Sequence, residues 1–584
     1  MTLKKISAFL LAGVLLLTTA GVQAGEEKEY GVLFEKDKII EVRVTLDEQD
    51  WQEILADPGA EEYHTATVTV EGNTVENVGF RTKGNSSLTS LVDSESERYS
   101  FRIKLDKYVE GQNLLGLDEF VVNNMFSDPS YLREYLSYEA LREIGSPAPL
   151  CAFVNLYIND RLYGFYLGIE AIDNSFLERC FGDDTGNLYK QDMGSGLVYQ
   201  EGSDYPQSSL KNGEDTAKTG LKNFIKLLND IPEGEKGEIE SVLDIDSALQ
   251  YIAGNTVMGN YDSYNGQHAQ NYYLYEQEGK FYVIPWDYNM SFGGFMGSAL
   301  AGETIPVDQP VMNASMEETP LITKLLAIPE YKEKYYGYIR ALINYFEGFE
   351  ERVAELAEQI RPYVEQDPSK FVTMEQFENS IVYSENPQEQ EMTQADGNVP
   401  PQFPEGMQEN GMGRPPEDND GPPRQMQGEK WTAPPQGGAG GGMMSGNGVS
   451  IVTFMTNRLE NLKQQLAGEI PTTGNTTMNR NNGQGSGRPG QQPQKQEIKV
   501  KLDGTQIQFD QQPVLENDRT LVPLRAVFEA LGMTVGWEQE SQTVTAVNSD
   551  TVIPVSYTHL SAKPLSLMRK TFRRGLWESR KRIR

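Results

Sequence analysis

The sequence is poor in the residues that build disulfide scaffolds and histidine-based sites. Its 584 residues include two cysteines, Cys151 and Cys180. Two cysteines are too few for a fold of this size to depend on disulfide bonds. Cys151 lies in an apolar run, so we expect a buried free thiol, with a single disulfide as the alternative. The three histidines are too scattered for a metal site built from histidines or for a Ser-His triad. Carboxylates, amides and lysines must therefore carry any chemistry.

Basic residues are also scarce. The chain holds 51 Lys and Arg against 85 Asp and Glu, which gives a formal net charge of -34. Binding to nucleic acid needs clustered Lys and Arg, so this composition argues against it. A basic protein partner, or solubility alone, fits the charge better.

Long apolar runs are missing beyond the N-terminus, and none approaches the roughly 20 residues that span a bilayer. Residues 1–24 contain Lys4 and Lys5, then a mostly apolar run, then small residues that end at Ala24. This order predicts a cleaved signal peptide and an exported protein that is not transmembrane.

The remaining sequence predicts an α+β protein with two lobes. Short alternating runs indicate a strand-rich N-lobe over about 30–198, interrupted by one helix over 130–144. Apolar spacings of three and four indicate a helical C-lobe over about 216–468. Residues 387–448 are rich in Pro, Gly, Gln and Met, so we expect a disordered insertion, after which a helix returns to the core.

The C-terminal part predicts a separate small module. After a polar linker over 469–496, residues 497–550 read as strands and one helix, and they resemble the N-terminal stalk domain of copper amine oxidases, an appendage of exported Gram-positive proteins. The basic stretch 555–584 matches the translation of a transposon sequencing adaptor, so we expect it to be an assembly artefact and the module to be truncated.

One hairpin gathers groups suited to metal and phosphate chemistry. Residues 272–275 and 281–284 are strand candidates around a short Gly-containing turn, which brings Asn271 and Asp287 to the same end of the ribbon. Asp262 lies in the loop that leads to this end. Oxygen donors beside a further carboxylate suit Mg²⁺-assisted phosphoryl transfer. The alternative is that these three residues only cap turns and satisfy loop backbone.

Four motifs in a fixed order strengthen the first interpretation. They are RTKGNSS (81–87), FRIKLD (101–106), GFYLGIEAID (164–173) and PWDYN (285–289). Together they closely resemble the spore coat protein H (CotH) kinase family over about residues 35–468. The resemblance implies an atypical two-lobed protein-kinase-like fold that uses ATP and Mg²⁺ to phosphorylate Ser of secreted or coat proteins.

The resemblance also implies roles for individual residues. Asp262 is similar to the catalytic aspartate, and Asp287 to the metal-binding aspartate, with Asn271 and Asn289 beside it. The expected nucleotide-binding residues are Arg81, Lys83, Asn85, Lys104, Glu139 and Glu170. Among these, Lys104 and Glu139 are expected to form an ion pair, and Glu170 to lie at the adenine. Lys104 and Glu139 have a plainer alternative as solvated surface residues, and Arg81 and Lys83 as members of a salt-bridge cluster.

We therefore expect an exported Ser protein kinase on a cell wall or spore coat, with basic Ser-containing substrates. Asn289 departs from the family pattern, in which a second acid is expected, so metal binding could be weaker. A non-catalytic surface or matrix adhesin that keeps the fold is the main alternative. A metal-dependent hydrolase is the third.

Overall fold

The computed structural model describes residues 28–295 except 93 and 95, then 302–384 and 449–474, and short parts of 501–556. The chain forms two compact units, 1–478 and 479–584, which are described separately. The expected signal peptide, the insertion over 387–448 and the tail from 557 lie outside the described residues.

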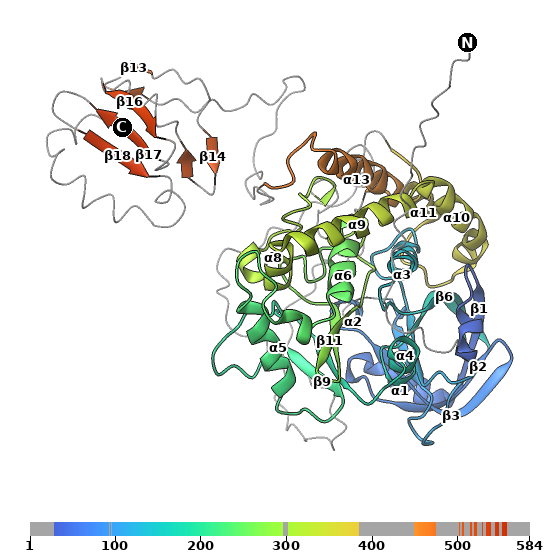
Figure 1. The fold of residues 1–584 in the computed structure, drawn as a ribbon. Coiled ribbons are helices and arrows are strands. Elements are labelled where there is room, and N and C mark those ends of the chain that lie inside the picture. Colours follow the sequence, from blue (N-terminus) through green and yellow to red (C-terminus); the bar gives the residue numbers. More distant parts are fainter. Residues whose placement is uncertain are drawn as a thin grey trace, which may run out of the picture. The chain divides into compact units, whose positions relative to one another are not determined.

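A closed barrel forms the N-terminal part of the first unit (Figure 1). Its strand order is β1-β2-β3-β4-β5-β7-β6, and it closes through the parallel pair of β1 and β6. In β1 every second side chain is buried, as expected of a strand with one face on a core. The barrel strands are β1 (Ile39–Leu46), β2 (His64–Val70), β3 (Asn73–Lys83), β4 (Ser100–Lys104), β5 (Glu119–Asn123), β6 (Cys151–Ile158) and β7 (Arg161–Glu170).

Strand β6 separates two hydrophobic cores. Val154 and Leu156 belong to the core inside the barrel, whereas Cys151 and Phe153 pack into the larger core shared with the helices. Cys151 and Cys180 are both buried free thiols, so the disulfide alternative is wrong. Burial raises the pKa of each thiol to about 12.

Short helices connect and flank the barrel strands. The helix predicted over 130–144 is α3 (Arg133–Glu143), almost entirely buried against the larger core. The others are η1 (Glu29–Phe34), α1 (Glu48–Ala56), η2 (Pro58–Ala60), α2 (Ser86–Val92) and α4 (Asn174–Phe181).

A second sheet, with strand order β11-β10-β8-β9, carries the predicted hairpin. The barrel ends at Glu170, and β8 pairs with β10 rather than with a barrel strand. The expected lobe boundary near 198 therefore lies inside the second sheet, because local strand patterns do not reveal pairing partners. The elements are β8 (Asn187–Gln191), β9 (Ser208–Asn212), β10 (Tyr272–Gln277) and β11 (Lys280–Pro285), with α5 (Thr219–Asn229), η3 (Ile239–Ser241) and α6 (Ile245–Met258).

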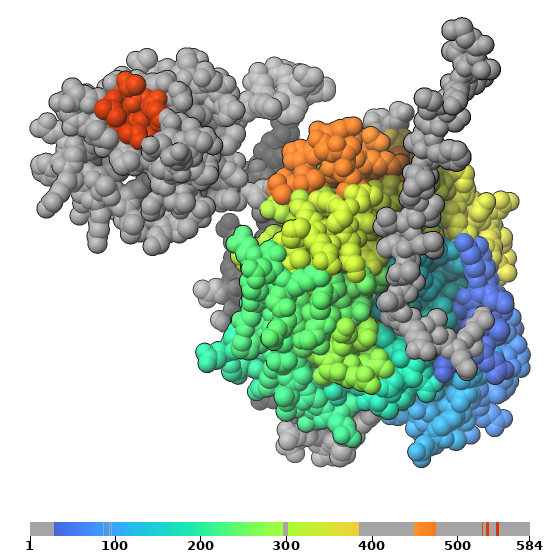
Figure 2. All heavy atoms as spheres, viewed as in Figure 1, coloured from blue at the N-terminus to red at the C-terminus, as the bar shows by residue number. Residues whose placement is uncertain are grey.

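Helices complete the first unit. They are η4 (Met316–Glu318), α8 (Pro320–Leu326), α9 (Pro329–Tyr345), α10 (Phe349–Gln366), α11 (Met374–Ser380) and α13 (Ile451–Leu466). The expected return helix is α13, and Figure 2 shows its segment, in orange, against the yellow surface of the preceding helices. Arg458 of α13 is fully buried and donates hydrogen bonds to the carbonyls of Thr256, Glu303 and Ile305. The backbone N–H of Ser384 donates to Thr453 Oγ1 at 2.8 Å, so the two flanks of the insertion over 387–448 lie side by side.

The first unit also extends into the expected linker, since Thr472 Oγ1 donates to Asp308 Oδ2 at 2.7 Å. In the second unit the described strands are β12 (Lys501–Leu502), β13 (Thr505–Gln506), β14 (Val514–Glu516), β15 (Arg519–Leu521), β16 (Thr534–Glu538), β17 (Thr543–Val547) and β18 (Val552–Ser556). Strand β18 pairs with β17, so the sheet runs past the expected end at 550. The helix expected over 524–531 falls mostly outside the described residues.

The predicted α+β architecture is confirmed. Within the described part of the chain, no helix is long and apolar enough to span a bilayer.

Candidate active site at the end of the hairpin

The hairpin of β10 and β11 brings Asn271 and Asp287 to one end, as predicted. Tyr272 pairs with Pro285, so Asn271 lies just outside the first strand and Asp287 two residues outside the second. The turn at Glu278 and Gly279 has positive φ at both residues, which is typical of a two-residue type I′ hairpin. Asn271 and Asp287 also have positive φ, 61° and 58°, a region that Asn and Asp tolerate better than most residues.

The loop after helix α6 places Asp262 at the same end of the hairpin as Asn271. The helix ends at Met258, and Gly259 follows with a φ of 61°. A Cβ at Gly259 would lie 2.4 Å from Phe454 Cζ, so only glycine permits both this turn and the close approach of α13. Asp262 comes three residues later in a partly exposed loop.

Two amide side chains hold the carboxylate of Asp262. Gln270 Nε2 donates to Asp262 Oδ1 at 2.6 Å, and Asn271 Nδ2 donates to Oδ2 at 3.1 Å. Asn271 Nδ2 also donates to the backbone carbonyl of Asp262 at 2.7 Å. Because its amide nitrogen faces Asp262, Asn271 keeps its carbonyl oxygen for another ligand.

Asp262 and Asp287 interact electrostatically. Burial, and then the negative charge of Asp287, raise the pKa of Asp262 to about 6, against the lowering effect of the two amide hydrogen bonds. Burial also raises the pKa of Asp287, while Lys83 and Lys190 lower it. The charge of Asp287 thus disfavours ionisation of Asp262, and a cation close to these two carboxylates would be stabilised.

Lys83 is the expected nucleotide-binding lysine that lies with these carboxylates. Burial lowers its pKa, while Asp287 and Glu134 raise it. Its ammonium lies 5.9 Å from the centre of the Trp286 ring, next to Asp287 in sequence. Lys83 of β3 in the barrel thus interacts with Trp286 and Asp287, which follow the hairpin of the second sheet.

Glu134 of α3 is a site residue that the sequence analysis missed. Burial, and then Asp287, raise its pKa to about 8, and Lys83 lowers it. Glu134 accepts hydrogen bonds from Asn123 Nδ2 at 2.7 Å and Tyr138 Oη at 3.1 Å, and Tyr138 Oη accepts from the Asp287 backbone N–H at 3.0 Å. The sequence pattern that could have revealed it is the spacing of Glu134 with Tyr138 and Leu141, which places this glutamate on the buried face of the helix.

The expected ion pair of Lys104 with Glu139 is wrong. Lys104 lies 3.7 Å from both Asp106 and Glu119. Although burial alone would lower its pKa, these two carboxylates raise it. Glu139 instead pairs with Lys36 at 3.0 Å and Arg352 at 3.1 Å. Both side chains thus have other charged partners, and in the β3–β4 register Lys104 pairs with Gly79, four residues along β3 from Lys83.

The other expected phosphate-loop residues lie around the end of β3. Arg81 is buried, pairs with Glu61 and stacks on the Tyr63 ring at 4.9 Å, which matches the salt-bridge alternative. Gly84 has a φ of 138°, which lets the chain turn from β3 into α2. Asn85 is exposed at this turn.

Glu170 is fully buried and its side chain stabilises the fold. It accepts from Tyr30 Oη at 2.6 Å and from the Leu150 backbone N–H at 2.9 Å, and it pairs with Arg179 at 2.5 Å. Both carboxylate oxygens are therefore engaged, and an adenine contact through this side chain is not available. A contact between adenine and the backbone near Glu170 stays a prediction.

The oxygen donors fit a hard divalent cation. Asp287, Asn271 and Asn289 are all partly exposed, and together they offer one carboxylate and two amide oxygens. Oxygen ligands with few charges are typical of Mg²⁺ sites that also use phosphate oxygens and water. These residues would hold the ion, with Lys83 and Lys190 as neighbouring positive charges.

Comparisons with known proteins confirm both expected families. The family model described as CotH kinase protein matches residues 80–392, and that described as copper amine oxidase N-terminal domain matches residues 501–560. Inner spore coat protein H of Bacillus subtilis (strain 168) is 27% identical over 285 residues, which cover 46% of this chain and 75% of that protein.

Two further relatives are more distant. Spore coat protein homolog 1 of Rhizopus delemar is 24% identical over 254 residues, 40% of each chain. Inner spore coat protein H-like protein of Bacillus subtilis is 22% identical over 250 residues, 43% of this chain and 67% of that protein. Since the first family model covers more than half of the sequence, the chain belongs to the CotH kinase protein family.

Proposed function

We propose that this protein is an atypical protein kinase that transfers the γ-phosphoryl group of ATP to Ser side chains, with Mg²⁺ as cofactor. The observation that carries the proposal is the convergence of Asp262, held by Asn271, with the electrostatically linked group of Asp287, Lys83 and Glu134. A positioned acid, oxygen ligands for a cation and a nearby lysine are the parts that phosphoryl transfer needs. On this proposal the barrel and the helical part act as the two lobes of a kinase-like fold.

The residues divide the work between orienting and charge balance. Asp262, with a pKa of about 6, is ionised at neutral pH and accepts the hydrogen bond of the attacking Ser hydroxyl. Its two amide partners fix the direction of that acceptor. Lys83 and Lys190 offset phosphate charge, and Glu134 positions Lys83. Asp287 and Asn271 would hold Mg²⁺, which would supply charge neutralisation at the phosphates.

The setting of this activity follows from the relatives and the charge. Two of the relatives are named as inner spore coat proteins, which supports association of this chain with a spore coat or cell surface. A net charge of -34 favours basic, Ser-containing protein substrates by electrostatic attraction. The N-terminal sequence supports export.

Incubation with γ-labelled ATP and Mg²⁺ tests the proposal. We expect the wild type to label itself or a basic Ser-containing protein, and Asp287→Asn to lose at least ~100-fold of this activity, because a metal-bound charge is removed. Asn tolerates the positive φ of Asp287, so the backbone is kept. Asp160→Asn is the matched control, since Asp160 has a φ of 61° and an 88% exposed side chain on the barrel turn.

Asn289 favours a second function, a non-catalytic surface or matrix binding protein. An amide there brings no negative charge to the metal, which weakens the attraction for Mg²⁺. Absence of labelled protein with both wild type and variant, under conditions where the wild type binds substrate, would support this adhesin. Free phosphate without labelled protein would instead indicate a metal-dependent hydrolase.

A further inference from the structure

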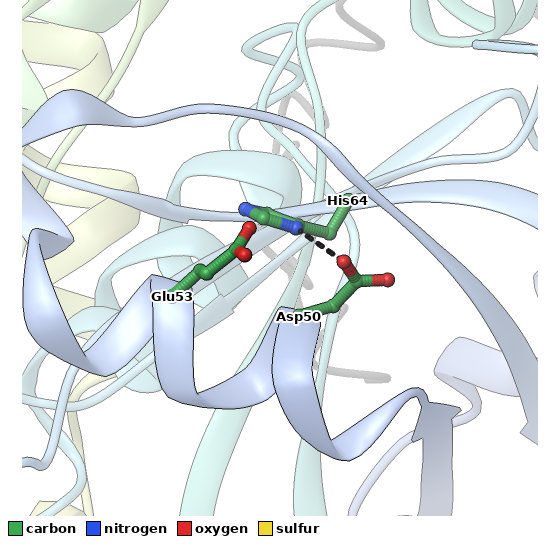
Figure 3. A group of neighbouring side chains, drawn as sticks. All are labelled: Asp50, Glu53 and His64. Carbon is green, nitrogen blue, oxygen red and sulfur yellow. Dashed lines mark ion pairs between the residues drawn. The ribbon is translucent and has the colours of Figure 1, made fainter.

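A histidine and two carboxylates meet where α1 approaches the first residue of β2, in a cluster that shares no residue with the candidate active site. Asp50 and Glu53 lie one turn apart on α1, and His64 is the first residue of β2. Figure 3 shows both carboxylates directed toward the imidazole ring. His64 Nδ1 lies 3.2 Å from Asp50 Oδ1, and one potential ligand atom of each residue lies within 4.8 Å of the other two.

We propose that Asp50, Glu53 and His64 form a binding site for a divalent transition metal ion of the Zn²⁺ type. The imidazole decides the class of metal, because Mg²⁺ and Ca²⁺ prefer sites made of oxygen alone, whereas Zn²⁺ and its neighbours accept nitrogen with carboxylate oxygen. Among the described residues, no other group of three or more His, Cys, Asp and Glu side chains has this spacing.

The geometry needs little rearrangement to receive the ion. Zn–N bonds of about 2.1 Å and Zn–O bonds of about 2.1 Å in a tetrahedron place neighbouring ligand atoms about 3.4 Å apart. The three ligand atoms now lie within 4.8 Å of one another, so small side-chain rotations would bring them to this spacing. The His64 side chain is 13% exposed, whereas that of Asp50 is 37% exposed and so meets fewer neighbouring atoms. The exposed side leaves room for water as a fourth ligand.

Binding there would close the loop between α1 and β2. This connection contains Glu61 and Tyr63, the residues that hold Arg81, and its Pro58 carbonyl accepts a hydrogen bond from Thr82 Oγ1 at 2.6 Å. A metal that joins Glu53 to His64 reduces the freedom of this connection, and so stabilises the native state in proportion to its binding. The metal is therefore a structural ion that braces β3 near Arg81.

The small number of histidines makes the site easy to test. The untagged full chain has three, so ¹³C labelling at the Cε1 position of histidine gives one imidazole signal for each of the three residues. We expect Zn²⁺ to shift the His64 signal, and isothermal titration to show one Zn²⁺ site that millimolar Mg²⁺ does not compete for. Glu53→Gln should weaken Zn²⁺ binding at least tenfold, since loss of even an outer partner of a metal ligand costs about 10–100-fold.

Glu48→Gln serves as the control, because Glu48 lies on the same helix but bonds only to Gln52 among the described contacts. It should bind Zn²⁺ as the wild type does. His64→Asn should lose the site, and a circular dichroism spectrum like that of the wild type would show that it folds. Unchanged Zn²⁺ affinity in Glu53→Gln, or a Zn²⁺ shift confined to His268 or His559, would overturn the proposal.

Discussion

Replacing Asp262 by Asn should stabilise the protein at neutral pH while removing its proposed activity. The native pKa of Asp262 is about 6, raised by burial and by Asp287 from a usual 3.8. A native state that holds its proton more tightly than the unfolded state loses stability as pH rises from about 4 to 6. Two pKa units correspond to about 3 kcal/mol, which sets the upper limit of the penalty above pH 6.

The hydrogen bonds that Asp262 accepts reduce the stabilisation expected for the Asp262→Asn variant. The carboxylate accepts from both Gln270 and Asn271, and an amide turns one oxygen into an NH₂ group that faces a donor. A lost hydrogen bond costs about 1 kcal/mol, which leaves a net stabilisation of about 1–2 kcal/mol at pH 8. Below pH 4 the carboxyl is protonated in both states, so the gain disappears there and the variant is slightly less stable than the wild type.

Urea unfolding without Mg²⁺ at pH 4, 6 and 8, followed by tryptophan emission, measures the difference between the two proteins. Asp183→Asn provides a control of opposite sign. Hydrogen bonds from Thr185 lower the pKa of Asp183, so its loss should not stabilise the protein at any of these pH values. A difference for Asp262→Asn that is the same at pH 4 and pH 8 would refute the assigned pKa.

Three further predictions test other parts of the structure. Lys83→Met should weaken ATP binding at least tenfold by equilibrium dialysis, whereas Lys104→Met should change it less than twofold, because Lys83 lies with Asp287 and Lys104 pairs with Glu119. Asp367→Ala should lower the free energy of unfolding by about 3–5 kcal/mol in a denaturant titration, because it leaves the buried Arg98 without its carboxylate partner at 2.6 Å. A loss below ~1 kcal/mol would contradict this. Replacing 387–446 by a short Gly/Ser linker should leave the unfolding midpoint unchanged, because the flanks are already hydrogen-bonded together.

Local patterns determined much of this protein. The hairpin was readable because β10 and β11 are short aromatic and aliphatic runs around a Gly-containing turn, and antiparallel pairing then places Asn271 and Asp287 at one end. The helix that became α3 and the buried Cys151 were readable for the same reason, since each depends on a few neighbouring residues. The ordered motifs identified the family over about residues 35–468, and the family model matches residues 80–392 within that range.

Tertiary structure decided which charges meet. Lys83 and Lys104 stand on paired strands, yet the register separates them by four residues, about 13 Å along β3. Glu134 and Glu139 are five residues apart on α3, about 140° around the helix axis, so they face different neighbours. Barrel closure and the packing of α3 then select Lys83 with Glu134. A sequence contains such residues, but it does not contain the pairing of distant strands that brings their charges together.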